Sequence, residues 1–262
     1  MMTQHGEDPG RADASTVPAL VADRVERSFG AVMAIKDVSI TIAAGERRAI
    51  LGPNGAGKTT LFNTICGDYP PTGGRIMLFG EDVTTLNPHR RARLGIGRTY
   101  QSSLLFTGLT VLENLYLGVR GAMPNRLSLR KAGRDDAALA KARRLAEQVR
   151  VDRICDARID SLSHGQRRQV EVGMALACDP RLLMLDEPAA GLSAAERPEL
   201  VKLIGDLPRD LTLILIEHDM DVALPNCDIV TVMKDGEVVV ESTPDRIADD
   251  PVVQAIYLGG GH

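Results

Sequence analysis

The 262-residue sequence contains few aromatic residues and no tryptophan: four phenylalanines and four tyrosines are its whole aromatic content. A buried core must therefore consist mainly of aliphatic side chains, which are plentiful because hydrophobic residues form 44% of the chain. Charged residues form 25% and leave a net charge of −4. This slightly negative balance argues against capture of nucleic acid by a bulk positive field.

Cysteine pairs and long apolar runs are also missing. The four cysteines stand far apart without a CxxC pair, so their spacing indicates neither a zinc site nor a disulfide framework. No apolar run approaches the roughly 18–20 residues that cross a bilayer. Residues 1–16 lack the apolar segment of a secretory signal peptide, and their composition predicts a disordered tail. We expect a cytoplasmic protein that reaches a membrane only through a partner.

The rest of the chain alternates between strand-like and helical segments. Alternating, β-branched or continuous apolar stretches predict strands at residues 17–29, 38–42, 47–51, 75–79, 181–185, 211–216, 229–233 and 237–241. Asp235-Gly236 predicts a hairpin turn between the last two of these. Helical spacing is seen over 59–66 and dominates from about 107 to 159.

A glycine-rich loop follows the strand at 47–51. Its residues, Gly52-Pro53-Asn54-Gly55-Ala56-Gly57-Lys58-Thr59, match the phosphate-loop pattern GxxxxGK[ST] between a strand and a helix. Glycines allow backbone N–H groups to point at phosphate oxygens, and the helix N-terminus adds partial positive charge. Lys58 can reach the β- and γ-phosphates, and the Thr59 hydroxyl can ligate Mg²⁺. The alternative, a glycine-rich turn without a ligand, would not need the lysine and the threonine.

Two acids, Asp186 and Glu187, end the apolar run Leu182-Leu183-Met184-Leu185. Ligands of parallel α/β sheets bind at the carboxyl ends of strands. Asp186 is suited to hold Mg²⁺, and Glu187 is suited to polarise an attacking water as general base. A solvated strand end with two ordinary surface acids is the alternative interpretation.

The segment Ser161-Leu162-Ser163-His164-Gly165-Gln166 precedes a helical stretch. Ser163 and Gln166 fit the S-x-x-Q capping box, so a well-capped helix start is one interpretation. The same segment resembles the LSGGQ signature of ABC-type ATPases. It departs from the commonest form at His164, where glycine is usual, but it keeps Ser163, Gly165 and Gln166, the residues that the resemblance implies meet phosphate.

Four other positions strengthen the resemblance to ABC-type ATPases, which runs from about residue 17 to the end. Gln101 resembles the Q-loop glutamine, Ala190-Gly191-Leu192-Ser193 resembles the D-loop, and His218 resembles the switch histidine. Phe29 lies where this family places an aromatic ring under adenine. The segment Leu104-Leu105-Phe106 after Gln101 could face a membrane partner or simply fill the core.

The resemblance implies an α/β fold: a phosphate-loop NTPase core with an antiparallel β subdomain and a helical subdomain insertion. We expect a disordered tail at 1–16, the ATP-binding core at 17–101 and 160–240, the helical subdomain at 102–159 and a C-terminal helical extension at 241–262. It also implies that two ATP-binding subunits pack head to tail, with ATP between the phosphate loop of one and the signature of the other.

The implied roles divide into three sets. Catalysis falls to Glu187, His218 and Gln101, and Mg²⁺ is held by Thr59, Gln101 and Asp186. ATP is bound by Phe29, Gly52, Pro53, Asn54, Gly55, Ala56, Gly57, Lys58, Thr59 and Thr60, and by Ser163, Gly165 and Gln166 of the facing subunit.

The stretch Gly95-Ile96-Gly97-Arg98-Thr99-Tyr100-Gln101 is similar to the GIGRTFQ stretch of ATP-binding subunits of branched-chain amino acid importers. The signature with Glu171-Val172-Gly173-Met174 resembles the related urea-type branch. The resemblance therefore implies an ATPase on the cytoplasmic face of the membrane. Its partners would be permease subunits, a second ATP-binding subunit, identical or different, and indirectly an external substrate-binding protein.

The alternatives are a lipopolysaccharide-export ATPase and a soluble ABC ATPase acting on nucleic acid. A soluble ABC ATPase of that kind usually has two cassettes or a long coiled coil. A basic segment at 126–134 could face lipid headgroups or simply be solvated. The transported molecule is not encoded in this subunit.

Overall fold

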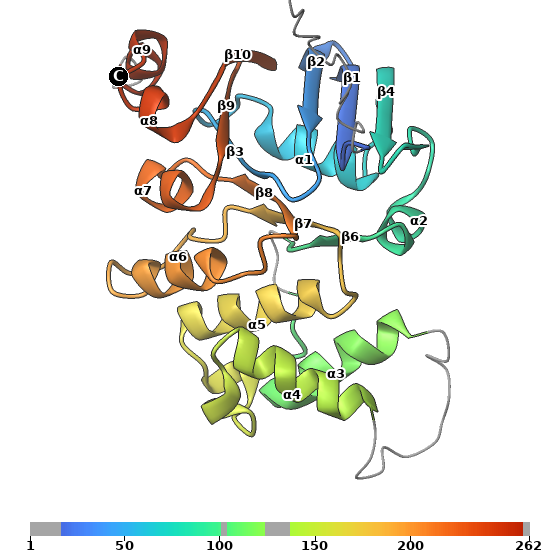
Figure 1. The fold of residues 1–262 in the computed structure, drawn as a ribbon, viewed down its shortest axis with the longest axis vertical. Coiled ribbons are helices and arrows are strands. Elements are labelled where there is room, and N and C mark those ends of the chain that lie inside the picture. Colours follow the sequence, from blue (N-terminus) through green and yellow to red (C-terminus); the bar gives the residue numbers. More distant parts are fainter. Residues whose placement is uncertain (1–16, 101–103, 124–136, 259–262) are drawn as a thin grey trace, which may run out of the picture.

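The computed structural model describes residues 17–100, 104–123 and 137–258. The predicted tail, Gln101 and the basic segment at 126–134 lie outside the described residues. Two β-sheets occupy the upper part of the molecule and a layer of helices the lower part (Figure 1). No helix among the described residues is long and apolar enough to span a membrane.

The first sheet is antiparallel and consists of β1 (Leu20–Phe29), β2 (Val32–Ile42), β4 (Gly73–Leu78) and β5 (Glu81–Asp82), in the order β2-β1-β4-β5. The strand predicted at 38–42 is only the second half of β2. Bulges explain the difference: the register shifts between β1 and β2, and Asp37, directly before the predicted segment, adopts a φ of 47°. Each bulge interrupts the alternation of apolar and polar residues from which strands are predicted.

The second sheet has six strands among the described residues: β3 (Arg47–Leu51), β6 (Ile96–Arg98), β7 (Leu182–Asp186), β8 (Thr212–Ile216), β9 (Ile229–Lys234) and β10 (Glu237–Ser242). Their order is β10-β9-β3-β8-β7-β6, and only β10 is antiparallel to its neighbour. Every residue of β3, β7 and β8 is buried, as the continuous apolar runs of β7 and β8 predicted for those two strands. The hairpin predicted at Asp235-Gly236 joins β9 to β10.

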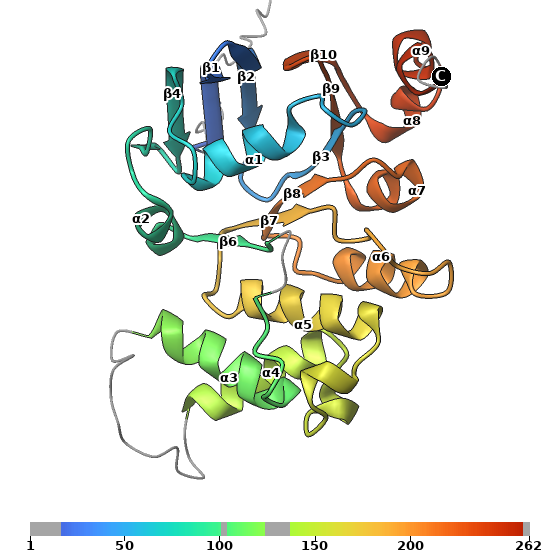
Figure 2. The same cartoon turned by 180° about the vertical axis from the view of Figure 1, so that it is seen from behind.

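The two faces of this sheet belong to different cores. Ile50, Met184 and Ile214 pack with the antiparallel sheet and with α1 (Lys58–Cys66). Their neighbours along the strands, such as Ala49 and Leu183, pack on the opposite side with the helical layer. This division follows from the alternation of side chains in a β-strand. It places α1 between the two sheets, in agreement with the views from both sides (Figures 1 and 2).

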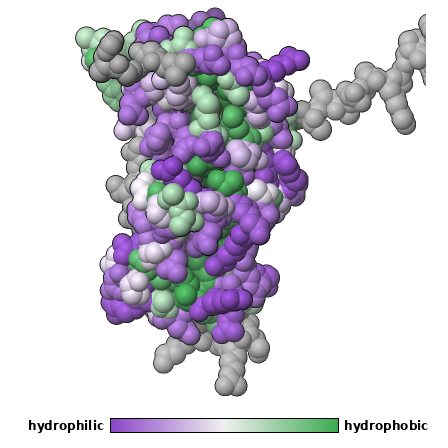
Figure 3. Space-filling model, turned by 90° about the vertical axis from the view of Figure 1, so that its left-hand side faces the viewer, coloured by the Kyte–Doolittle hydropathy of each residue, from purple (hydrophilic) through white to green (hydrophobic). Residues whose placement is uncertain are grey.

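The helical layer is formed by α3 (Val111–Ala122), α4 (Ala137–Gln148) and α5 (His164–Leu176), which pack against one another. Since α5 also contacts β6 and β7, it joins this layer to the sheet. The remaining helices are α2 (Pro88–Arg93), α6 (Arg197–Gly205), α7 (Met220–Ala223), α8 (Pro244–Ile247) and α9 (Pro251–Leu258). The side bearing the C-terminal helices is mainly hydrophilic, with separate apolar patches (Figure 3). The subdomain boundaries drawn from the sequence stay predictions.

Candidate nucleotide site

The phosphate loop curls between the end of β3 and the start of α1, and its glycines are required by the space around them. A Cβ atom on Gly52, whose φ is 150°, would lie 2.2 Å from the carbonyl oxygen of Met233. A Cβ atom on Gly57, at φ 96°, would lie 2.6 Å from the carbonyl oxygen of Ala34. The loop is therefore pressed against both sheets, and only glycine fits at these two positions.

Lys58 lies across this loop with only 5% of its surface exposed. Its Nζ donates hydrogen bonds to the carbonyl oxygens of Gly52 at 2.7 Å and Pro53 at 3.0 Å. Burial lowers the pKa of Lys58, although the nearby carboxylates of Glu187 and Asp186 oppose this effect. The ammonium group thus stands between the loop and the two acids, where a phosphate oxygen could replace a carbonyl as its partner.

Strand pairing brings three predicted groups to one edge of the sheet. Ile216, the last residue of β8, lies opposite both Ile50 of β3 and Asp186 of β7. The phosphate loop follows β3, Glu187 follows β7, and Glu217 and His218 follow β8. Because the carboxyl ends of adjacent parallel strands share an edge, these segments converge at the position where such sheets bind ligands.

Asp186 is a buried carboxylate with an unused oxygen. The residue is 3% exposed, and its Oδ1 has no hydrogen-bond partner. Burial, together with the charge of Glu187, raises the pKa of Asp186 to about 6, although a hydrogen bond with the Thr59 side chain acts in the opposite direction. A buried carboxylate that lacks a partner and lies beside a hydroxyl offers the oxygen ligands that Mg²⁺ prefers. The two residues therefore fit the predicted metal position.

Glu187 has a left-handed backbone conformation, with φ 45°, which is unusual for a residue other than glycine. Its N–H donates to the carbonyl oxygen of Ile216 at 2.9 Å, and its own carbonyl accepts from the N–H of Ala190 at 3.0 Å. The Oε1 atom of Glu187 lies 3.9 Å from Nδ1 of His218, whose side chain is 55% exposed. The two predicted catalytic side chains thus face each other at the sheet edge.

Glu217 was not predicted as a functional residue, yet it lies directly beneath this pair. Its side chain is fully buried, and burial raises its pKa. Oε1 accepts from the N–H of Ala189 at 3.0 Å, and Oε2 accepts from the N–H of His218 at 3.3 Å. The Glu217 carboxylate therefore links the backbone N–H of Ala189, two residues after Glu187, to the backbone N–H of His218 through hydrogen bonds. No sequence signal distinguished Glu217 from an ordinary strand-end acid.

Phe29, predicted to lie under adenine, is 41% exposed at the end of β1. Tyr69 meets its ring edge-on, with the centroids 5.2 Å apart. The guanidinium of Arg27 lies 4.5 Å from the Phe29 centroid. Arg27 and Tyr69 were not predicted, and the guanidinium lies over both aromatic rings, so the three side chains form one cation–π cluster.

The segment that leads to Gln101 continues β6, the edge strand that pairs with β7. The N–H of Thr99 donates to the carbonyl oxygen of Met184 at 3.0 Å. A cavity of about 340 Å³ is lined here by Thr99, Tyr100 and Asp186, among others. Leu105 is buried, whereas Leu104 and Phe106 are 59% and 53% exposed. The interpretation of this segment as core is therefore wrong for the two exposed residues.

The signature segment begins α5, and the capping box predicted there is confirmed. The N–H of Gln166 donates to Oγ of Ser163 at 3.3 Å, and the N–H of Ser163 donates to Oε1 of Gln166 at 3.0 Å. Nε2 of His164 donates to the carbonyl oxygen of Ala190 at 3.2 Å. No hydrogen bond among the described residues joins Ser163, Gly165 or Gln166 to the phosphate loop.

Glu196 reaches the signature from the segment before α6, and the sequence did not reveal this contact. Its Oε1 accepts from the N–H of Gly165 at 2.9 Å and from Oγ of Ser163 at 3.0 Å. Its Oε2 accepts from the N–H and hydroxyl of Ser193 at 3.1 and 2.8 Å. These hydrogen bonds, that from Gly165 above all, lower the pKa of Glu196 to about 2.

The C-terminal helix also contacts the phosphate loop. The hydroxyl of Tyr257, in α9, accepts a hydrogen bond of 3.1 Å from the N–H of Gly52. Burial raises the pKa of this hydroxyl. This hydrogen bond joins residues 205 positions apart and fixes the first residue of the phosphate loop against α9.

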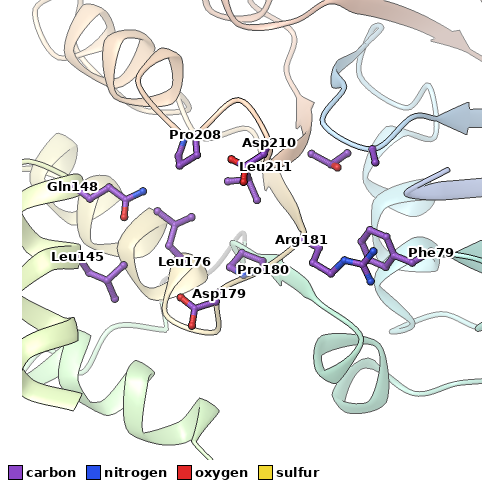
Figure 4. A pocket seen from close by; sticks show the side chains of 12 residues that line it. Phe79, Leu145, Gln148, Leu176, Asp179, Pro180, Arg181, Pro208, Asp210 and Leu211 are labelled. Atoms are coloured by element: carbon purple, nitrogen blue, oxygen red, sulfur yellow. The ribbon is translucent and has the colours of Figure 1, made fainter. Parts of the chain in front are cut away.

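A separate cavity of about 460 Å³ lies at the opposite edge of the sheet (Figure 4). Leu145 and Leu176 line it from the helical layer, and Pro208 and Leu211 line it from the segment before β8. Arg181 stacks over the ring of Phe79 at 3.7 Å beside it. None of the predicted site residues lines this cavity, so it is not the candidate nucleotide site.

Comparison with known proteins agrees with this geometry. The model of the ABC transporter family matches residues 35–190. The high-affinity branched-chain amino acid transport ATP-binding protein BraF of Pseudomonas aeruginosa is 35% identical, over 92% of this chain and 98% of its own length. The lipopolysaccharide export system ATP-binding protein LptB of Haemophilus influenzae is also 35% identical, over 92% of this chain and 97% of its own length.

Solved structures show the same fold. An ATP-binding cassette of an ABC transporter in its ADP conformation is 32% identical and superposes with a TM-score of 0.82, over 93% of this chain and all of the cassette. A dimeric bacterial ABC transporter cassette is 25% identical, with a TM-score of 0.73 over 86% of this chain and 98% of its own length.

Proposed function

The chain belongs to the ABC transporter family of ATPases, and on that premise we propose that it energises uptake of branched-chain amino acids, or of urea and short amides. The proposal is supported by the similarity to BraF and by the sequence of residues 95–101, which resembles the GIGRTFQ stretch of branched-chain amino acid importers. As the ATP-binding subunit of a transporter, the chain would lie on the cytoplasmic face of the membrane against permease subunits.

The observation that carries the proposal is the convergence of Lys58, Asp186, Glu187 and His218 at one sheet edge. The phosphate loop would bind the β- and γ-phosphates with its N–H groups, and Lys58 would exchange a loop carbonyl for a phosphate oxygen. Phe29 and Tyr69 would contact the base. Thr59 and Asp186, together with Gln101, would hold Mg²⁺, which neutralises phosphate charge when bound.

Glu187 would act as the general base. Its carboxylate accepts a proton from a water whose oxygen bonds to the γ-phosphorus, while the bond from that phosphorus to the bridging oxygen of ADP breaks. His218 stands beside the carboxylate, 3.9 Å away, and is suited to contact the γ-phosphate. Ser163, Gly165 and Gln166 would complete the site of a second ATP-binding subunit, because the helix N-terminus carries N–H donors and partial positive charge.

Glu187→Gln tests the chemistry. The amide keeps the size of the side chain but cannot take a proton, so we expect ATP turnover to fall by about 10³-fold or more while ATP still binds. Turnover by the purified protein is measured as phosphate release, and binding with a fluorescent ATP analogue. Turnover at the wild-type rate in this variant would remove Glu187 as the base.

The direction of transport is tested by isolating the tagged protein from its own cells in mild detergent and identifying its partners by mass spectrometry. We expect two polytopic permeases, a second ATP-binding subunit and an external binding protein. Lipopolysaccharide export is the second candidate function, because LptB is as similar to this chain as BraF is, at 35% identity. Recovery of lipopolysaccharide-export proteins would favour that function. Either result leaves the ATPase chemistry unchanged.

A further inference from the structure

The donors at the start of α5 are already used within the chain. The hydroxyl of Ser163 and the N–H of Gly165 both donate to Oε1 of Glu196, at 3.0 and 2.9 Å. Each of these groups has a single hydrogen to donate. Ser163 and Gly165 are also two of the three residues that the proposed function assigns to the ATP site of a facing subunit, where an N–H and a hydroxyl would meet phosphate oxygens. The carboxylate and the phosphate therefore compete for the same hydrogens.

The chemistry of the two competitors is alike. A carboxylate oxygen and a phosphate oxygen are both anionic acceptors, and both are favoured at the N-terminal end of a helix dipole. Gly165 shows how closely the carboxylate fits, since a Cβ atom at this position would lie 2.9 Å from Oε1 of Glu196. The low pKa of Glu196, about 2, shows that the donors favour its charged form.

Glu196 is connected to the loop that follows the proposed base. Its second oxygen accepts from the N–H and hydroxyl of Ser193, the last residue of the D-loop. His164 adds a second link, because its Nε2 donates to the carbonyl oxygen of Ala190 in the same loop. A change at the signature can thus move the D-loop of the same chain.

We propose that Glu196 is an internal substitute for the γ-phosphate: it occupies the signature in the separated chain and is displaced when an ATP-loaded phosphate loop of a second subunit docks there. This inference rests on the proposed function. Its consequence is that the signature is held in shape before ATP arrives, and that ATP must outcompete a carboxylate of the same chain. Release of Glu196 also frees Ser193 to change its position.

The first test measures how much ATP is needed to bring two chains together. The chain carrying Glu187→Gln is labelled with two fluorophores in separate batches, and energy transfer is followed as MgATP is added. Adding Glu196→Gln to this chain should lower the midpoint ATP concentration about tenfold or more, because the free energy of one hydrogen bond to a charged acceptor corresponds to a change of that size. An unchanged or higher midpoint would overturn the proposal.

Glu199→Gln is the matched control. Glu199 lies in the first turn of α6, three residues beyond Glu196, and the substitution removes the same charge without touching the signature. If Glu199→Gln lowers the midpoint as much as Glu196→Gln, the effect is one of net charge, and the proposal fails.

The second test uses the nucleotide-free chain alone, so it does not depend on association. Hydrogen–deuterium exchange of the peptide containing Gly165 should be faster in Glu196→Gln and faster still in Glu196→Ala, while Glu199→Gln exchanges like the wild type. Equal exchange in all four proteins would show that Glu196 does not hold the signature. Loss of ATP binding by the parent chain would instead contradict the proposed function, which separates the two failures.

Discussion

Replacement of Asp186 by asparagine is expected to stabilise the nucleotide-free protein while weakening its response to Mg²⁺. Asp186 is 3% exposed, its Oδ1 has no partner, and its pKa is raised from 3.8 to about 6. A shift of roughly two pKa units at about 1.4 kcal/mol per unit means that the ionised carboxylate costs about 3 kcal/mol of folding free energy at pH 7. The uncharged amide avoids that cost.

The sign of the effect fixes its pH dependence. Below pH 3.8 the carboxyl is protonated in both the folded and the unfolded state, so it costs nothing. As the pH rises toward 6 the unfolded chain loses the proton first, and the free energy of unfolding of the wild type decreases. The advantage of Asp186→Asn should therefore be about half developed near pH 5 and constant above about pH 7.

Urea denaturation of both proteins from pH 5 to 8, with Mg²⁺ chelated, measures this difference. Asp82→Asn is the control, because hydrogen bonds from Thr84 lower the pKa of this exposed carboxyl and the same substitution should not stabilise the chain. Addition of MgATP should stabilise the wild type more than Asp186→Asn. An Asp186→Asn protein that is no more stable than the wild type at pH 7.5, or a difference that does not vary with pH, would refute the reasoning.

Two further substitutions test contacts that hold the site. Tyr257→Phe removes the acceptor of the Gly52 N–H, so we expect the free energy of unfolding to fall by about 1–2 kcal/mol in urea and ATP to bind more weakly in a fluorescence titration. Glu217→Gln leaves only one acceptor oxygen for the N–H groups of Ala189 and His218. It should lower kcat about tenfold with KM for ATP unchanged, since it disturbs the proposed catalytic pair and not the phosphate loop; equal losses in binding and turnover would contradict this.

The parts of the site that were predictable from the sequence are those set by local chain geometry. The phosphate loop needs glycines at Gly52 and Gly57 because two carbonyl groups approach them, and it joins a strand to a helix as expected. Asp186 ends a continuous apolar run, and such a run predicts a buried strand whatever surrounds it. Ser163 and Gln166 cap a helix through contacts three residues apart.

The parts that the sequence did not reveal depend on contacts between distant residues. Glu196 lies 31 positions from Gly165, and Tyr257 lies 205 positions from Gly52. Neither contact leaves a periodic pattern, because each depends on how separate elements pack. Glu217 is hidden for the same reason: its neighbours along the chain resemble any strand end, and only the packing of β3, β7 and β8 buries it.

The division of the central sheet between two cores has an evolutionary consequence. Ala49 and Ile50 are covalent neighbours, but they pack into different cores. Substitutions that share no packing partner are generally additive in their effect on stability. Selection can therefore change the residues that pack against the helical layer without requiring compensating changes in the residues that pack against α1. Such a sheet allows the packing on one of its faces to diverge within a family while the packing on the other face stays under separate constraint.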